Sequence, residues 1–255
     1  MIVTLVAVLL AFATLWIVSL FRRDASIVDP AWGPGFLLIT TLAFAQGAGG
    51  GRPLLILVMV ALWALRLGGY LWWRGRGHGE DFRYAAMRAK HGARFWWVSG
   101  LTVFGFQAVL CWIISLPLQV AAVSSKPLIW LDFLGAGLWL VGFLWEAVAD
   151  AQLARFKARR TDPQAVLDTG LWAWSRHPNY FGEWVLWWGF YAVALAAGGW
   201  WTLFAPALMS VLLMRVSGVP LLEKKLAERP AFRAYVERTP AFFPWVPPRA
   251  TKSPR

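Results

Sequence analysis

Residues 170–189, GLWAWSRHPNYFGEWVLWWG, are the stretch around which this chain is organised. A short polar run lies between aromatic residues and continues directly into a hydrophobic segment. Polar groups at the mouth of a membrane helix are costly to hold there and usually serve a purpose. Pro178 suits the first turn of a helix, so we predict that a helix begins near it. Residues four apart then share a helix face. The stretch predicts a compact polar cluster where a helix leaves the water, made of Arg176, His177, Asn179, Tyr180 and Glu183.

The composition places this cluster in a membrane protein. The 255 residues are 59% hydrophobic and 15% charged, with a mean hydropathy of +0.54, and the apolar residues occur in long blocks. The formal charge of +12 is carried by basic residues interleaved with these blocks. It indicates cytoplasmic loops or a phosphorylated ligand, so we expect no nucleic-acid partner. The one cysteine, Cys111, allows no internal disulfide or cysteine-based metal cluster, and we expect no metal.

The apolar blocks predict an all-α, multi-span integral membrane helical bundle in a single domain, residues 1–255. We expect seven transmembrane helices at approximately residues 1–21, 31–45, 53–73, 96–123, 128–149, 180–195 and 201–216, followed by a cytoplasmic amphipathic tail, residues 217–255. The first segment has no basic n-region and no cleavage site, so we expect it to be retained as a helix. Pro117 predicts a kink in the fourth span.

The basic residues predict the orientation of the bundle. Arg22 and Arg23, the cluster at 74–94, the run at 155–160 and the tail all fall on one side of a seven-span arrangement. The opposite side has only Arg52 and Lys126. The positive-inside rule then places the N-terminus outside and the C-terminus in the cytoplasm. The polar clusters all lie at the cytoplasmic end, where they are open to cytosolic cofactors.

A second polar cluster ends the predicted fifth span. Glu146 and Asp150 are four residues apart, so both carboxylates lie on one face of a helix, and basic residues that include Lys157 follow. One interpretation is that arginines from neighbouring loops pair with the two acids. The other is that the acids hold hydroxyl or amide groups of a polar ligand whose phosphates contact the basic residues.

A third cluster is RGRGHGEDFRY, residues 74–84. Its glycines let the backbone approach a ligand closely, and arginines such as Arg76 suit phosphate. The segment matches neither a dinucleotide fingerprint nor a P-loop. His78 is as consistent with a solvated loop residue as with a functional one. In the tail, Tyr235 and Arg238 either close over a ligand or serve packing and membrane-surface contact.

Asp29, in the sequence DPAWG, has two interpretations. It is a helix N-cap followed by proline, or it is an acid that faces into the bundle and polarises a substrate carbonyl in company with a tyrosine. The candidates for the partner of Asp29 are Arg66, Tyr70 and Tyr84. Of the phenols we select Tyr84, and we predict Asp29 and Tyr84 as the catalytic residues.

Taken together, these motifs resemble the steroid 5-alpha-reductase superfamily, in particular its bacterial DUF1295-type membrane branch. The resemblance rests on an E-x-x-x-D pair ending a span, a basic loop, G-L-W-A-W-S-R-H-P-N-Y-F-G-E opening the next helix, and a basic tail with Y-x-x-R. It implies a seven-helix enzyme of the bacterial inner membrane, with its active site toward the cytoplasm. The implied reaction uses NADPH to reduce the carbon–carbon double bond of a 3-oxo-4-ene steroid or similar enone.

The resemblance also implies site residues. Glu146 and Asp150 match a cofactor-binding polar pair, although the steroid enzymes have asparagine at the first position. Asn179 and Glu183 match the N-x-x-x-E of the helix opening, and Asp29 is a shorter acid than the glutamate of the family. The basic cofactor contacts fall at Arg76, Lys157 and Arg215. We also expect cofactor contacts from Arg176, His177, Tyr180 and Tyr235. The expected partners are a lipophilic enone entering from the bilayer and membrane lipids, with the protein as a monomer.

Two other functions share these residues. R-H-P-x-Y also occurs in membrane methyltransferases of the isoprenylcysteine carboxyl and phospholipid type, which bind S-adenosylmethionine. The Glu146/Asp150 pair, the Asn179/Glu183 spacing and seven spans favour the reductase. A transporter or membrane scaffold would have charged residues near the middle of spans or matching halves, and the sequence has neither.

Overall fold

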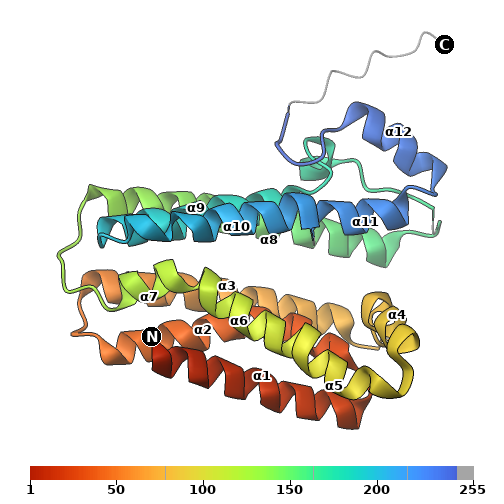
Figure 1. Cartoon of the computed structure of the whole chain (residues 1–255). Helices are drawn as coiled ribbons and strands as arrows, with labels where there is room; N and C mark the ends of the chain where they lie inside the picture. The colour runs from red at the N-terminus through yellow and green to blue at the C-terminus, as the bar shows by residue number, and fades with distance from the viewer. Residues whose placement is uncertain (78, 163, 217, 246–255) are drawn as a thin grey trace. The chain divides into compact units, whose positions relative to one another are not determined.

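The computed structural model describes residues 1–77, 79–162, 164–216 and 218–245, and its regular elements over these residues are all helical. His78 and residues 246–255 of the predicted tail lie outside the described residues. Figure 1 shows the α-helices: α1 (Ile2–Arg22), α2 (Val28–Gln46), α3 (Gly51–Gly75), α4 (Phe82–His91), α5 (Phe95–Ser99), α6 (Phe106–Ile114), α7 (Leu116–Ala122), α8 (Trp130–Arg159), α9 (Pro178–Ala196), α10 (Phe204–Val211), α11 (Val219–Leu226) and α12 (Pro230–Arg238).

Five helical stretches of the described residues are long and apolar enough to cross a membrane: Ile2–Arg22, Ala25–Gln46, Gly51–Gly75, Phe82–Ile114 and Trp130–Arg159. A shorter apolar stretch, Trp200–Val216, joins a 3₁₀ turn, α10 and a terminal π-helical segment. The predicted all-α, multi-span membrane bundle is confirmed at this level. Helix α9 is not among the five, because its polar opening and its many tryptophans and tyrosines lower its hydropathy.

The predicted boundaries fail in two places. The predicted fourth span, residues 96–123, is not one helix: α5 passes through a π-helical segment, Gly100–Gly105, into α6, and the chain breaks at Ser115 before α7. Pro117 lies in the first turn of α7, where a missing N–H costs nothing, so the kink that it predicts is a break between two helices at Ser115. The predicted fifth span ends at 149, whereas α8 continues to Arg159 and makes Asp150 and Lys157 helical.

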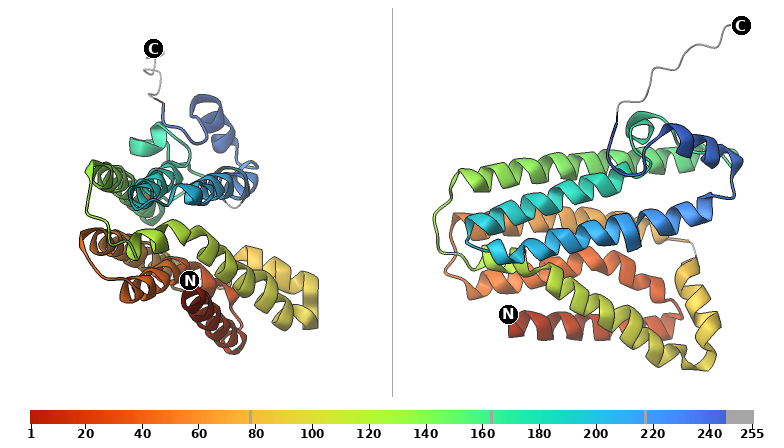
Figure 2. Two further views of the ribbon diagram at one scale, coloured as in Figure 1. Left: turned by 60° about the vertical axis from the view of Figure 1, so that its left-hand side comes forward. Right: turned by 45° about the horizontal axis from the view of Figure 1, so that its top comes forward.

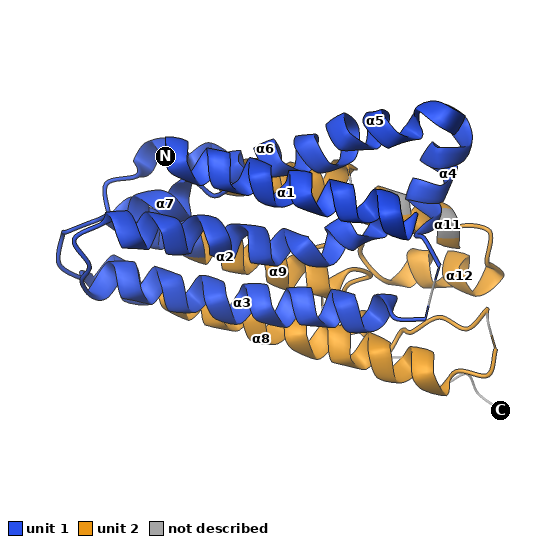
Figure 3. Cartoon of the chain, turned by 90° about the horizontal axis from the view of Figure 1, so that it is seen from below, with its two compact units in different colours: residues 1–133, 190–205 blue, residues 134–189, 206–255 orange. Residues whose placement is uncertain are grey.

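The chain forms two compact units (Figure 3). Unit 1 comprises Met1–Phe133 and Phe190–Ala205, and unit 2 comprises Leu134–Gly189 and Pro206–Arg255. Helices α8, α9 and α10 each contribute residues to both units.

Unit 1 is built on the close pairing of α2 with α3. Gly33 lies so near Ala64 that an added Cβ would come within 2.9 Å of its carbonyl oxygen. Trp63, fully buried on α3, packs edge-on against Phe36 and Phe190 at ring distances of 5.6 and 6.1 Å. The core of unit 1 therefore includes a residue that is far along the chain from the helices it contacts.

A buried ion pair fastens the start of α3 to the start of α8. Arg52 and Asp132 have no exposed side-chain surface, and Nε and Nη2 of Arg52 donate to the two Asp132 oxygens at 2.7 and 2.8 Å. The remaining guanidinium hydrogens reach Ser124 Oγ and two backbone carbonyls. A buried ion pair is tolerated only when its hydrogen-bonding groups are satisfied in this way.

Unit 2 is built on α8 and α9, which run antiparallel and side by side (Figure 2). A Cβ on Gly182 would lie 2.6 Å from the backbone nitrogen of Glu146, and one on Gly142 would lie 2.5 Å from the carbonyl oxygen of Gly182. Gly189 meets Trp139 equally closely. Small residues let helix backbones approach in this manner. The contact brings the polar end of α8 beside the polar start of α9.

Candidate functional site

The polar cluster of unit 2 forms where α8 and α9 meet. Helix α9 begins at Pro178, as the sequence predicted. Asn179 Nδ2 donates to Asp150 Oδ1 at 3.2 Å, and the Asp150 side chain is buried. Glu146 and Glu183 are also buried, 3% and 8% exposed, on the same two helices. The contact between Gly182 and Glu146 shows that these acids flank the helix crossing. The structure thus brings the E-x-x-x-D pair and the N-x-x-x-E pair to one place.

Two buried polar atoms of this region have no hydrogen-bond partner among the described residues. They are Asn179 Oδ1, an acceptor, and Trp145 Nε1, a donor. Buried polar atoms are nearly always paired, so an unpaired atom needs an explanation such as a ligand. A dinucleotide carries amide, amine and hydroxyl hydrogens that an amide or carboxylate oxygen accepts, and phosphates that basic residues bind. The donor and acceptor set of unit 2 therefore suits a ligand with amide or hydroxyl groups and phosphates.

Arg176 and His177 lie on the loop before α9 and contact a single acid of α11. Arg176 donates to both oxygens of Glu223, with its Nε at 2.8 Å from Oε1. His177 Nε2 lies 3.1 Å from the same Oε1, and its ring stacks on Tyr180 with centroids 5.6 Å apart. Burial alone would raise the pKa of Glu223, but hydrogen bonds from His177 and Arg176 and their charge outweigh it and lower the pKa to about 2.

The C-terminal segment is fastened to the same loop. Tyr235 of α12 is 2% exposed, and its hydroxyl donates to the carbonyl oxygen of Trp172 at 2.5 Å. Burial raises the pKa of Tyr235. Further bonds join residues 175–176 to 239–242, including Arg176 N to Pro240 O at 2.9 Å and Ser175 Oγ to Phe242 O at 2.8 Å. Arg238 pairs with Asp168. In these contacts Arg176, His177 and Tyr235 hold the tail on the loop, which agrees with the packing interpretation of the tail.

The basic residues that we expected to contact phosphate are exposed. Lys157 lies in the last turn of α8, and Arg215 lies in the π-helical segment Leu212–Val216 that follows α10. Both belong to unit 2. Arg76 belongs to unit 1, where it follows α3 and its guanidinium lies 3.5 Å from the ring centroid of Trp72.

Unit 1 contains a second cluster around Asp29. The hydroxyl of Tyr84 donates to Asp29 Oδ1 at 2.7 Å, and Arg83 Nη2 donates to Oδ2 at 2.5 Å. Tyr84 is 6% exposed, and Gln107 Nε2 lies 3.5 Å from its hydroxyl. Tyr84, one of the companions proposed for Asp29, hydrogen-bonds to it. The arrangement joins a phenol, a carboxylate and a guanidinium.

The N-cap interpretation of Asp29 is wrong. Helix α2 begins at Val28, one residue earlier, so Asp29 lies inside the first turn. The capping acids are Asp24, which accepts from Ser26 N, and Asp81, which accepts from Arg83 N at the start of α4. Glu80 links the same elements because it accepts from Ala25 N and pairs with Arg88. The Arg88 hydrogen bond holds the pKa of Glu80 below its ordinary value.

Sequence reasoning missed Glu223 and Trp145, and it offered Arg83 only as a phosphate ligand and not as the partner of Asp29. Glu223 is 46 residues from His177 in the chain, and no local pattern joins them. Trp145 resembles the many lipid-facing aromatics around it. Arg83 lies in a segment where several arginines are equivalent by sequence. One sequence signal points to Arg83: it directly precedes Tyr84, which we predicted as the partner of Asp29.

Comparisons with known proteins identify the family of the chain. The family model "Protein of unknown function (DUF1295)" matches residues 15–239. "Uncharacterized protein C594.04c" of Schizosaccharomyces pombe (strain 972 / ATCC 24843) is 27% identical over 278 residues, covering 94% of this chain and 79% of the relative. No solved structure matches the chain. Because the family model spans both clusters, from the first helix to the end of α12, the chain belongs to the DUF1295 family of membrane proteins.

Proposed function

We propose that this chain is an NADPH-dependent membrane reductase that acts on the carbon–carbon double bond of a lipophilic enone, of the 3-oxo-4-ene steroid type. The observation that carries the proposal is the Asp150–Asn179 hydrogen bond with a buried, unpaired Asn179 Oδ1 beside it. The resemblance of the motifs to the steroid 5-alpha-reductase superfamily supplies the reaction type.

The proposal assigns cofactor binding to the residues of unit 2. Asn179 Oδ1, Asp150, Glu146 and Glu183 accept hydrogen bonds from amide and hydroxyl groups, while Lys157 and Arg215 neutralise phosphate. NADPH, when bound, supplies the hydride. Arg176, His177 and Tyr235 act indirectly, since they hold the loop that leads into α9.

The proposal assigns activation of the substrate to unit 1. Negative charge that develops on the substrate carbonyl oxygen needs a hydrogen-bond donor. Tyr84 carries that donor: its single hydroxyl hydrogen, which Asp29 accepts in the structure, turns to the carbonyl oxygen when the substrate binds. Arg83 neutralises the Asp29 carboxylate that the hydroxyl leaves. A site with few water molecules around the reacting atoms strengthens each of these interactions.

The same proposal includes the membrane arrangement. The five candidate spans, together with α9 and Trp200–Val216, make seven, with the N-terminus outside and the C-terminus in the cytoplasm. In a bacterium this is the inner membrane, with the site toward cytosolic NADPH. Exposed tryptophans support an orientation in which the helices of unit 1 cross the membrane, because tryptophan is enriched at membrane–water interfaces. Trp72 and Trp73 lie exposed at the end of α3, Trp130 at the start of α8, and Trp200 in the segment that precedes α10.

The test is a binding measurement on the purified chain in detergent. NADPH fluorescence is titrated with wild type, Asn179→Ala and the matched control Gln164→Ala, which removes an exposed amide from the 160–169 loop. We expect Asn179→Ala to weaken NADPH binding about 5- to 150-fold, because the loss of a buried hydrogen bond costs on the order of 1–3 kcal/mol. Gln164→Ala should bind NADPH as wild type does.

Binding of S-adenosylmethionine in place of NADPH would replace the reductase by the methyltransferase alternative. Unchanged NADPH affinity in Asn179→Ala would remove unit 2 as the cofactor site. If NADPH binds, incubation with a panel of enones that includes 3-oxo-4-ene steroids then measures loss of the nicotinamide absorbance. Oxidation of NADPH that depends on the enone is the expected result.

A further inference from the structure

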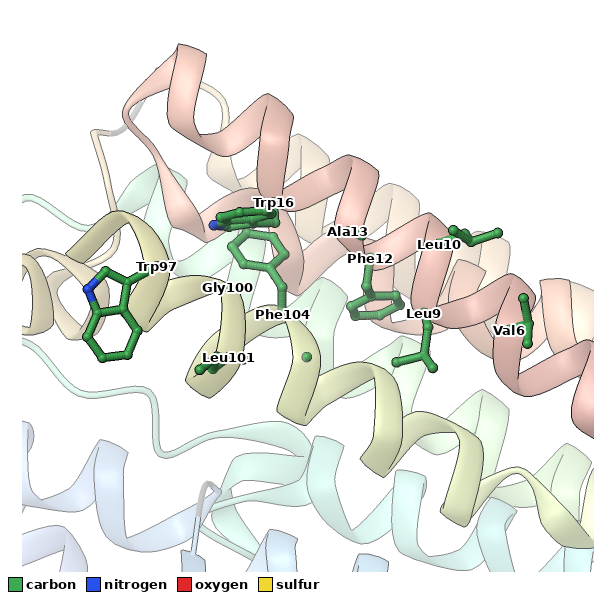
Figure 4. Close-up of a pocket in the computed structure, with 11 residues that line it drawn as sticks. Val6, Leu9, Leu10, Phe12, Ala13, Trp16, Trp97, Gly100, Leu101 and Phe104 are labelled. Atoms are coloured by element: carbon green, nitrogen blue, oxygen red, sulfur yellow. The ribbon is translucent and has the colours of Figure 1, made fainter. Parts of the chain in front are cut away.

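An apolar groove runs along the outside of unit 1 between α1 and the π-helical segment that joins α5 to α6 (Figure 4). Its volume is about 640 Å³, within the range of about 300–1,000 Å³ that is usual for ligand pockets. Phe12 and Phe104, each 1% exposed, form its floor. Its lining residues are all apolar except for the tryptophan N–H groups: Val6, Leu9, Leu10, Phe12, Ala13 and Trp16 from α1, and Trp97, Gly100, Leu101, Phe104 and Gly105 from the facing segment.

The groove is bounded at both ends, because α1 contacts the facing helices on either side of it. Near one end Trp16 Nε1 donates to the backbone oxygen of Trp96 at 2.8 Å, and the indole lies against Gly100. Toward the other end Thr4 accepts from Trp112 Nε1 at 3.1 Å and donates to Gln119 at 2.8 Å. These pairs also show that α1 runs antiparallel to the segment from α5 to α7.

The groove has the length of one membrane leaflet. From Val6 to Trp16 the helix rises about 15 Å at 1.5 Å per residue. That is about half of a hydrocarbon core of about 30 Å. An acyl chain of one leaflet therefore matches the groove in length and in polarity.

Exposed arginines follow the groove at its Trp16 end. Arg22 and Arg23 end α1, and Arg94 directly precedes α5. All three side chains are exposed, and within the described parts of the chain no hydrogen bond or ion pair involves these guanidinium groups. The nearby Arg88 differs, because Glu80 binds it at 2.8 Å. Exposed positive charge beside a lipid-sized apolar groove matches an anionic headgroup, and each such residue contributes on the order of 1 kcal/mol to binding an anionic surface.

We propose that this groove binds one phospholipid with an anionic headgroup, whose acyl chain lies between α1 and Gly100–Gly105 and whose phosphate contacts Arg22, Arg23 and Arg94. None of the residues of this site belongs to the proposed cofactor or substrate clusters. It holds whether or not the chain is a reductase.

The test is native mass spectrometry of the whole chain in detergent, titrated with dioleoyl phosphatidylglycerol or dioleoyl phosphatidylcholine. We expect one phosphatidylglycerol to bind more tightly than phosphatidylcholine. The variant Arg23→Gln/Arg94→Gln should lose about fivefold in phosphatidylglycerol affinity per arginine, which is the effect of about 1 kcal/mol each. The matched control Arg160→Gln, at an exposed arginine after α8, should not change it.

The groove itself is tested by Ala13→Phe, which fills it, and by Leu9→Ala/Leu101→Ala, which removes lipid contacts without adding volume. Both should weaken phosphatidylglycerol binding, whereas Leu140→Phe, at an exposed position of α8, should not. Elution as a single peak by gel filtration shows that each variant folds. Equal binding of the two lipids, or equal binding by the arginine variant and its control, overturns the proposal. Loss of binding in the arginine variant with none in the folded groove variants also overturns it.

Discussion

Asp29 holds the hydroxyl of Tyr84 on one carboxylate oxygen and the guanidinium of Arg83 on the other. If Tyr84 donates to the substrate, Tyr84→Phe should lower kcat by about 10²–10⁴-fold, the usual contribution of a positioned proton donor. The affinity for NADPH should stay unchanged, because this residue lies outside the proposed cofactor cluster. Steady-state turnover and NADPH titration on the same preparation measure both quantities. Unaltered kcat would assign Tyr84 a structural role.

Glu223 is the acid that holds Arg176 and His177. We expect Glu223→Gln to loosen residues 230–245, because hydrogen bonds to charged groups each contribute about 1.5–3 kcal/mol. The rate at which a protease cleaves the tail measures this effect. Glu237→Gln, which changes an exposed acid of α12, should leave the rate unchanged. Equal cleavage of the two variants would contradict a fastening role for Glu223.

The pKa of Glu223 also predicts a pH dependence. Its folded-state pKa of about 2 is below its ordinary value of 4.5. A lowered carboxyl pKa stabilises the folded state above 4.5, and this contribution is lost as the pH falls toward 2. Protection of residues 230–245 against hydrogen exchange, corrected for the intrinsic exchange rate, should therefore decrease in wild type between pH 4.5 and 2. In Glu223→Gln that part of the decrease should be absent.

Prediction from the sequence succeeded for residues that lie within a few positions of one another in the chain. The spacing of Asn179 and Glu183 and that of Glu146 and Asp150 follow from helix geometry, and Pro178 opens α9 as predicted. The role of Glu223 was not predictable, because its pairing depends on how α11 returns to the loop before α9. The unpaired state of Asn179 Oδ1 likewise depends on packing that no spacing encodes.

At the scale of helices, the glycines between α8 and α9 determine how closely the two polar clusters approach. Gly182→Ala should lower thermal stability, since its Cβ would lie 2.6 Å from the backbone nitrogen of Glu146 and the helices must separate. It should weaken NADPH binding as well. Gly137→Ala is the matched control on α8, where a Cβ meets nothing within 4 Å. We expect that change to be neutral or slightly stabilising, as alanine favours helix. Equal melting temperatures for both variants would contradict the close packing.

Long apolar blocks made the first three helices predictable, and their ends differ from prediction by a few residues. The π-helical segment at Gly100–Gly105 was not predictable, because the apolar pattern does not distinguish a π-helical turn from an α-helical one. The extension of α8 to Arg159 does not follow from the apolar pattern, because the charged residues after Ala149 continue the helix beyond the apolar span.

At the scale of the whole molecule, the Arg52–Asp132 pair joins segments 80 residues apart. Arg52→Ala should cost about 3–5 kcal/mol, because it leaves a buried carboxylate without its partner. The double variant Arg52→Met/Asp132→Leu should recover most of that loss, since apolar residues replace both charges. Thermal melts in detergent compare the three proteins. A single variant as stable as wild type would show that the pair contributes little.

Unit 1 is completed by Phe190–Ala205, with Phe190 against Trp63. During synthesis the core formed by residues 1–133 therefore stays incomplete until Phe190 has been made and can pack against Trp63. Unit 2 is completed later still, since its loop is fastened by residues 239–242, which are synthesised after Phe190–Ala205. A chaperone or insertase that shields the early helices would be needed most during that interval.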